Sequence, residues 1–115
     1  MANTFKCVTK AGVTSLDVIY TVASSTTTVV LGLVLGNTTT SQVTATVTLN
    51  TDTSNRSGAN DEDNQAVELV TNAPIPAGSS LELLSGNKVV LEATDEIKVS
   101  ASGATDVALS IMEIT

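Results

Sequence analysis

The sequence has no histidine, no tryptophan, one cysteine and two aromatic side chains, Phe5 and Tyr20, among its 115 residues. Without histidine, the usual Ser-His-Asp triad has no base to activate its nucleophile. A glycoside hydrolase needs sugar-stacking aromatics beside its paired carboxylates, and two aromatics are too few for such a cleft. The seven glycines follow no phosphate-binding spacing. We therefore expect a protein that is not an enzyme and that holds no cofactor and no metal.

Basic residues are also scarce, since five lysines and arginines face twelve acidic residues and leave a net charge of −7. Such a surface repels phosphate backbones and anionic lipids, so neither nucleic acid nor a membrane is an expected partner. The most hydrophobic run, residues 29–35, is too short to cross a bilayer. The single cysteine, Cys7, excludes an intrachain disulfide, as is typical of synthesis in a reducing compartment.

What the chain has in abundance is β-branched residues, with 19 threonines and 15 valines. These side chains favour pleated strands over helices. Because aromatics make up 2% of the sequence, the core must be built from Val, Leu, Ile and Ala. The length fits one domain over residues 1–115. Turn-forming residues recur about every ten residues, which predicts an all-β fold, an antiparallel β-sandwich or jelly roll of roughly eight or nine short strands.

Apolar patterns place these strands along the chain. They predict strands over residues 16–22, 27–36, 42–50, 65–70, 81–84, 88–92, 96–101 and 106–114. Residues 1–10 form either a weak first strand or an N-terminal arm, because terminal segments are disordered unless something ties them down. The run 27–36 is continuously apolar, which predicts a strand covered on both faces. Gly32 within it indicates a β-bulge or the close approach of another backbone.

The stretch from 72 to 91 contains both prolines of the chain, Pro74 and Pro76. They fix φ and remove two ladder donors, so this part is expected to be an extended sheet edge or crossover. Ser85, Gly86 and Asn87 form a tight-turn sequence between two short apolar runs. We therefore predict a hairpin in which 81–84 pairs with 88–92.

Residues 51–64 form one long polar loop without an apolar period. Its carboxylates could in principle bind calcium, which takes six to eight oxygen ligands. The EF-hand order is absent, however, and Arg56 stands where a ligand would be needed. A solvated acidic loop is the preferred interpretation, and the acidic residues concerned are Asp52, Asp61, Glu62 and Asp63.

The C-terminal half resembles a known group of proteins. Residues 72–102 read NAPIPAGSSLELLSGNKVVLEATDEIKVSAS, and residues 106–115 read DVALSIMEIT. The Pro-x-Pro-x-Gly corner, the K-x-V-L and D-x-I-K-V segments and the terminal D-V-x-x-S-x-x-E-I resemble small virion structural proteins of tailed bacteriophages of aquatic bacteria, including cyanobacteria. The N-terminal segments VIYTV and VVLGLVLGN are similar to the first half of the same group. Where this group often has glycine before the aspartate, Thr94 precedes Asp95 here, which leaves the turn type open.

This resemblance implies a virion component made in the host cytoplasm, first of all a capsid decoration or cement protein on the outside of the major capsid protein shell. Its expected partners are the major capsid protein and further copies of itself, with a trimer as a common state of decoration proteins. Neck, baseplate or fibre placement in the tail, with tail proteins as partners, is the alternative. A carbohydrate-binding module using the 51–64 loop is a second alternative. The expected protein contacts are Phe5, Cys7, Val8, Pro74, Ile75 and Pro76.

Overall fold

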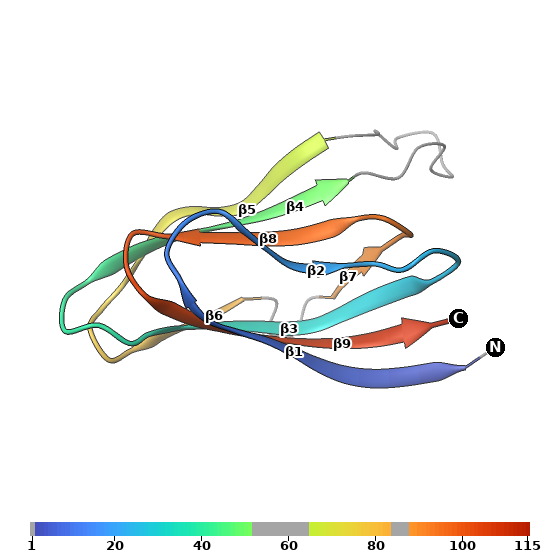
Figure 1. Ribbon diagram of the computed structural model, residues 1–115, viewed down its shortest axis with the longest axis horizontal. Coiled ribbons are helices and arrows are strands. Elements are labelled where there is room, and N and C mark those ends of the chain that lie inside the picture. Colours follow the sequence, from blue (N-terminus) through green and yellow to red (C-terminus); the bar gives the residue numbers. More distant parts are fainter. Residues whose placement is uncertain (1, 52–64, 84–87) are drawn as a thin grey trace.

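The computed structural model describes residues 2–51, 65–83 and 88–115. It shows an antiparallel β-sandwich of two packed sheets (Figure 1). Sheet A contains β1 (Asn3–Val13), β9 (Thr105–Ile114), β3 (Thr27–Asn37), β6 (Ser80–Leu83) and β7 (Val89–Leu91). Sheet B contains β2 (Asp17–Thr21), β8 (Glu96–Ala101), β4 (Val43–Thr51) and β5 (Gln65–Ile75). The predicted fold class is therefore confirmed, with nine strands in the described part of the chain.

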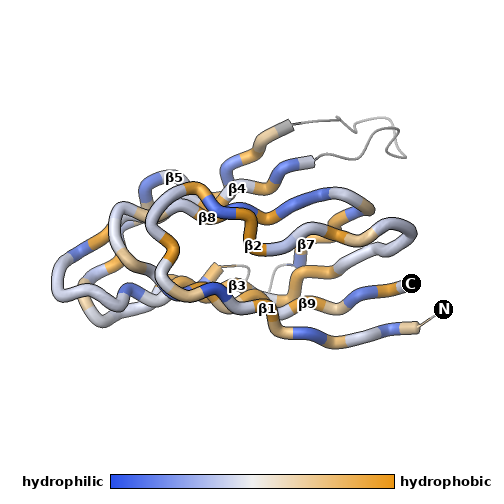
Figure 2. The backbone as a smooth tube through the Cα atoms, in the orientation of Figure 1, coloured by the Kyte–Doolittle hydropathy of each residue, from blue (hydrophilic) through white to orange (hydrophobic). Residues whose placement is uncertain are grey.

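The strands follow the period-two pattern of the sequence. In β8, Ile97 and Val99 are fully buried while Lys98 between them is partly exposed. Figure 2 shows hydrophobic and hydrophilic residues alternating along the strands of both layers. The buried apolar side chains of the described residues are all Val, Leu, Ile or Ala, as the shortage of aromatics predicts. Inward-facing residues of the two sheets thus form one core between the layers.

The N-terminal segment is a strand and not a detached arm. β1 pairs with β9 in antiparallel register from Asn3 opposite Ile114 to Val13 opposite Thr105. Just beyond the pair of Asn3 and Ile114, the amide of Thr115 donates a hydrogen bond of 3.0 Å to the carbonyl oxygen of Ala2. The two ends of the chain therefore lie side by side (Figure 1).

β3 lies inside sheet A, between β9 on one side and β6 and β7 on the other. The register shifts between Val30 and Gly32, which confirms the predicted bulge. The expectation that this strand is covered on both faces is wrong for the single chain. Sheet B covers the face of Leu33 and Leu35, whereas Val34 points to the opposite side with 39% of its surface exposed.

The predicted hairpin between 81–84 and 88–92 is also wrong. β6 pairs with β3 from Leu33 to Gly36, and β7 pairs with the same strand from Thr28 to Val30. The two short strands thus lie one after the other along the same edge of β3, with no pairing between them among the described residues. The tight turn predicted at 85–87 lies outside those residues.

The turn before β8 settles the question that Thr94 raised. Thr94 has a φ of 72°, which is the left-handed region, and its amide donates to the carbonyl oxygen of Val22 at 3.0 Å. The next residue, Asp95, is fully buried, and its carboxylate accepts a bond of 3.0 Å from the amide of Glu92. A glycine would adopt this φ without steric cost, whereas threonine is held there by the two hydrogen bonds of the turn to Val22 and within Glu92–Asp95.

Candidate interaction surface

The first part of the surface is the free edge of sheet A. β1 has β9 as its neighbour on one side and no described strand on the other. Nine of its eleven residues are exposed, so both of its faces as well as its edge meet solvent. Phe5 has 72% of its surface exposed, and Cys7 on the same strand is an exposed free thiol. An open edge of this length offers unpaired backbone groups to another strand.

The second part is the face of sheet A that points away from sheet B, called here the outer face. Strand registers define four rows of neighbours across it, each placing one residue per strand on the same side. Directly opposed residues share a face of an antiparallel sheet, so the rows follow from the pairing alone. From one end to the other they are Phe5–Met112–Val29–Val90, Cys7–Ser110–Gly32, Thr9–Ala108–Val34–Glu82 and Asp106–Gly36–Ser80.

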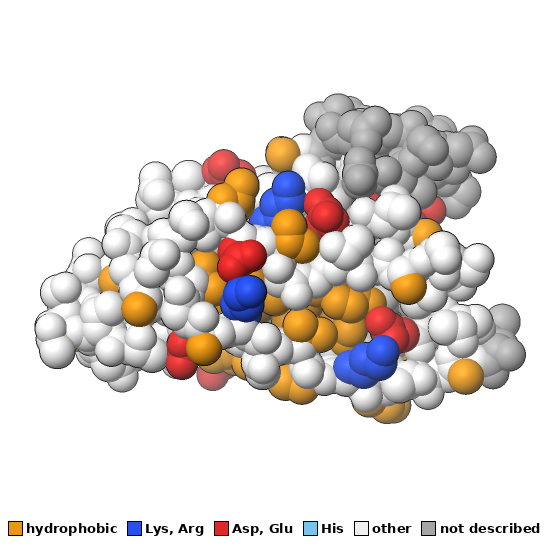
Figure 3. Space-filling model, viewed as in Figure 1, with side chains coloured by type: hydrophobic (Ala, Val, Ile, Leu, Met, Phe, Trp, Pro, Cys, Tyr) orange, Lys and Arg blue, Asp and Glu red, His pale blue; other side chains and the backbone are white. Residues whose placement is uncertain are grey.

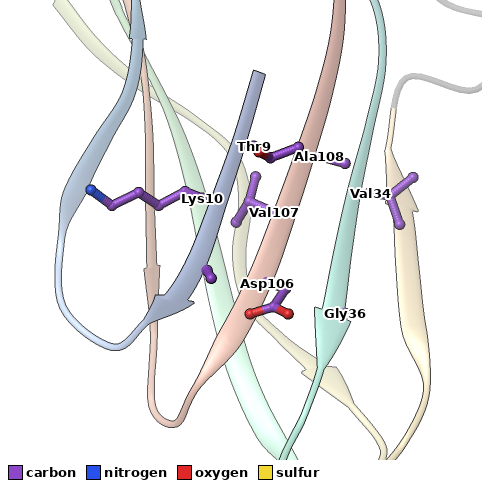
Figure 4. A pocket seen from close by; sticks show the side chains of 8 residues that line it. Thr9, Lys10, Val34, Gly36, Asp106, Val107 and Ala108 are labelled. Carbon is purple, nitrogen blue, oxygen red and sulfur yellow. The ribbon is translucent and has the colours of Figure 1, made fainter. Parts of the chain in front are cut away.

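A hollow lies at the end of the outer face where side chains are small. It has a volume of about 360 Å³ and is lined by Thr9, Lys10, Ala11, Val34, Gly36, Asp106, Val107 and Ala108. Figure 4 shows that these residues come from neighbouring strands and that the Lys10 side chain extends away from Asp106. The hollow exists because Gly36 has no side chain and Ala108 a short one in adjacent strands.

A polar cluster joins the inner side of β1 to sheet B. Nζ of Lys6 lies 2.7 Å from Oε1 of Glu113, and the Tyr20 hydroxyl donates to Oε2 of the same carboxylate at 2.5 Å. The hydroxyl groups of Tyr20 and Thr28 share a further bond of 2.8 Å. Figure 3 shows basic side chains next to acidic ones on this side of the molecule, with hydrophobic side chains at the surface between the layers. The cluster therefore holds β2 against three strands of sheet A.

This arrangement shifts two pKa values in opposite directions. Burial, reinforced by the bond to Glu113, raises the pKa of Tyr20 to about 12. The Lys6 ammonium, and then the Tyr20 hydroxyl, hold the pKa of Glu113 below its usual range. Both shifts favour the state in which a neutral phenol donates to a charged carboxylate. The cluster is thus a structural tie between the two sheets.

Because Tyr20 is the one tyrosine of the sequence, its titration can be followed by tyrosinate absorbance without overlap. We expect a native midpoint near pH 12, against about 10 for the unfolded chain. The unfolded chain loses its proton first, so stability should fall as the pH rises from about 10 to about 12. Tyr20→Phe should abolish that alkaline loss. A native midpoint near 10 would mean that the phenol is not held in this cluster.

The predicted contact residues are divided by the structure. Phe5, Cys7, Pro74 and Pro76 are exposed, and Val8 is half-buried against the core. Ile75 must be corrected: it is 1% exposed, lies opposite Val43 across β4 and β5, and cannot contact a partner. Pro74 lies on the edge of sheet B and Pro76 just beyond it, where the Pro76 carbonyl oxygen accepts a bond of 3.1 Å from the amide of Ser79, next to the fourth row of the outer face. The contacts predicted from the sequence did not include Val29, Val34 and Val90. Their outward position follows from pairing between distant strands.

Asp52, Asp61, Glu62 and Asp63 of the acidic loop lie outside the described residues. Within residues 2–51, 65–83 and 88–115, no group of three or more His, Cys, Asp or Glu side chains could hold a metal ion. The same part of the chain has no helix that could cross a lipid bilayer.

Comparisons with known proteins return little. No protein-family model matches the chain, and no curated protein matches it. Among solved structures, it is similar to a chain of Bacillus endospore appendages, which are described as a novel family of disulfide-linked pili. The two chains are 14% identical, with a TM-score of 0.49, and the match covers 99% of this chain and 87% of that one. A likeness of this size bears on neither the function nor the partners of this protein.

Proposed function

We propose that this protein is a structural component of a tailed-phage virion, specifically a capsid decoration protein that binds the outside of the major capsid protein shell. Two things support the proposal: the resemblance of residues 72–115 to small virion proteins, and the open edge strand β1. The single observation that carries the interaction role is that β1, at a free edge of sheet A, is exposed along nine of its eleven residues. The proposal assigns the chain no catalytic step.

The edge strand suggests how the shell would be bound. A strand of the major capsid protein would pair with β1, so that main-chain hydrogen bonds supply affinity and alternate side chains supply specificity. Phe5 would enter a pocket on the capsid protein or on a neighbouring copy, because an exposed aromatic is the usual anchor of a protein interface. The net charge of −7 would oppose unspecific association of free copies through most of their surface.

Copy number in purified virions tests this placement. Quantitative mass spectrometry, calibrated against the major capsid protein, should find this chain in hundreds of copies if it decorates the shell. A few dozen copies or fewer would place it in the neck, baseplate or fibre instead. Its absence from purified virions would overturn the virion assignment altogether.

A further inference from the structure

The outer face of sheet A is graded in side-chain size. Its first row is bulky and apolar, with Phe5, Met112, Val29 and Val90, and its second row has Cys7, Ser110 and Gly32, with the bulge residue Leu31 beside Gly32. The third and fourth rows contain the hollow of about 360 Å³. A ridge therefore stands at one end of the face and a depression at the other.

Charge is also unevenly distributed. The four rows contain two ionisable carboxylates, Glu82 and Asp106, both at the hollow end, while the exposed Lys88 lies two residues from Val90 beside the first two rows and Lys10 lines the hollow. Oδ1 of Asp106 already accepts a hydrogen bond of 2.9 Å from the amide of Gly12, which has a φ of 68°. Two copies of a chain with a net charge of −7 repel each other over most of their surfaces. The first two rows are a place where that repulsion is weakest.

We propose that the outer face of sheet A binds the same face of a second copy around a two-fold axis, so that Phe5 of each copy enters the hollow of the other. An isologous contact requires a surface that is complementary to itself after a rotation of 180°. A ridge at one end and a hollow at the other meet this requirement. A face with side chains of uniform size would not match itself in this way. A partner other than a second copy would not require the ridge and the hollow to be complementary to each other.

The positions of the two features fit such an axis. Phe5 and Thr9 lie on the same strand and the same side, four residues apart, which is a separation of about 13 Å along β1. A two-fold axis running across the strands midway between them passes through the row of Cys7, Ser110 and Gly32. The small side chains at these three positions let the two sheets approach to the usual face-to-face spacing of about 10 Å, with the bulge residue Leu31 beside them as a further apolar contact.

The size of the face is sufficient. Four strand positions at about 4.8 Å and about nine residues at 3.3 Å give a face of roughly 19 by 30 Å, so two copies would bury roughly 1,100 Å², which just reaches the range of specific interfaces. The dimer would also supply the second cover that the continuously apolar sequence of β3 predicts and that the single chain lacks. The free edge of β1 stays outside this contact, so the inference holds whether or not the virion placement is correct.

Sedimentation equilibrium over a range of concentrations tests the inference. The protein should fit a dimer of the 11.7 kDa chain. Phe5→Ser removes the ridge and Ala108→Phe fills the hollow, and each should weaken the dimer by about 30-fold or more, the change expected for an interface hot spot. Val67→Ser is the matched control, because Val67 is 45% exposed on sheet B and should leave the dimer unchanged. Circular dichroism and the urea midpoint show that each variant has folded.

Cys7 provides a second measurement on the unmodified sequence. The two thiols should face each other across the axis, so a bismaleimide with a spacer of about 10 Å should join two chains rapidly at Cys7. Crosslinking should be lost in Ala108→Phe. A monomer at all concentrations, a trimer, or a dimer that withstands both Phe5→Ser and Ala108→Phe would overturn the inference. None of these results depends on virion copy number, so the two proposals can fail separately.

Discussion

Replacing Asn37 by alanine is expected to lower the free energy of unfolding by about 3 kcal/mol, because four hydrogen bonds of a buried amide are lost together. Its Nδ2 donates to the carbonyl oxygens of Ser41 at 2.8 Å and Ile75 at 2.9 Å. Its Oδ1 accepts from the amide of Thr39 at 2.9 Å and from the hydroxyl of the same residue at 2.8 Å. Asn37 is 3% exposed, so water cannot readily replace these partners.

The reason for so large an effect is the place of this side chain in the fold. Asn37 ends β3 in sheet A, and Ile75 ends β5 in sheet B, so one amide ties the ends of the two layers together. Urea unfolding at a fixed protein concentration measures the change. Thr38→Ala is the control, since the Thr38 hydroxyl makes one exposed bond to Ala104 and its loss should cost well under 1 kcal/mol. A loss below 1 kcal/mol for Asn37→Ala would show that the tie is dispensable.

Truncating Leu109 to alanine is expected to lower the free energy of unfolding by about 3 to 4 kcal/mol. Leu109 is fully buried in the middle of β9, with Val8 opposite on β1 and Leu33 opposite on β3. A core made of aliphatic side chains held on rigid strands collapses poorly around a cavity, which places the cost in the upper part of the usual range.

The comparison variant for this prediction is Val18→Ala on β2. Val18 is 42% exposed, so its truncation should change the free energy of unfolding by about 0.5 kcal/mol or less. Thermal and urea unfolding should agree on the order of the two variants. Equal destabilisation by Leu109→Ala and Val18→Ala would contradict the assignment of Leu109 to the core.

The sequence was most informative where local alternation decides the outcome. The strands at 42–50, 96–101 and 106–114 were predicted from their apolar pattern, because a half-buried strand must alternate. β4, β8 and β9 confirm these predictions, with Val47, Val99 and Leu109 among the fully buried side chains. The shortage of aromatics likewise gave the correct composition of the core.

Local patterns failed where pairing between distant segments decides. The Ser85-Gly86-Asn87 sequence suggested a hairpin, but β6 and β7 each gain more by pairing with β3, which is longer and already held by β9. Continuous apolarity in β3 predicted cover on both faces but could not say whether the same chain supplies it. Fold topology is set by such long-range choices, which short windows of sequence do not contain.

The interaction surface was predicted only in part, because pairing between distant strands decides which residues share a face. Phe5 and Cys7 are exposed as expected, since an isolated aromatic near a chain end has few neighbours to cover it. Ile75 was misassigned because its neighbours, Pro74 and Pro76, indicated an exposed edge. The register with β4 instead turns the Ile75 side chain inward, opposite Val43. The graded outer face became visible only when strand registers placed residues from β1, β3, β7 and β9 in common rows.

The place of β9 has a consequence for how the protein is made. β9 separates β1 from β3 in sheet A, although it follows both of them in the chain by about 70 residues or more. During translation, β1 has no partner in its own sheet until residues 105–114 leave the ribosome, whereas β3 meets its other neighbours, β6 and β7, earlier. Sheet A therefore closes only after synthesis of β9, and until then a nascent chain exposes the whole of β1 and one edge of β3. Chaperone demand should thus rise with the rate of synthesis.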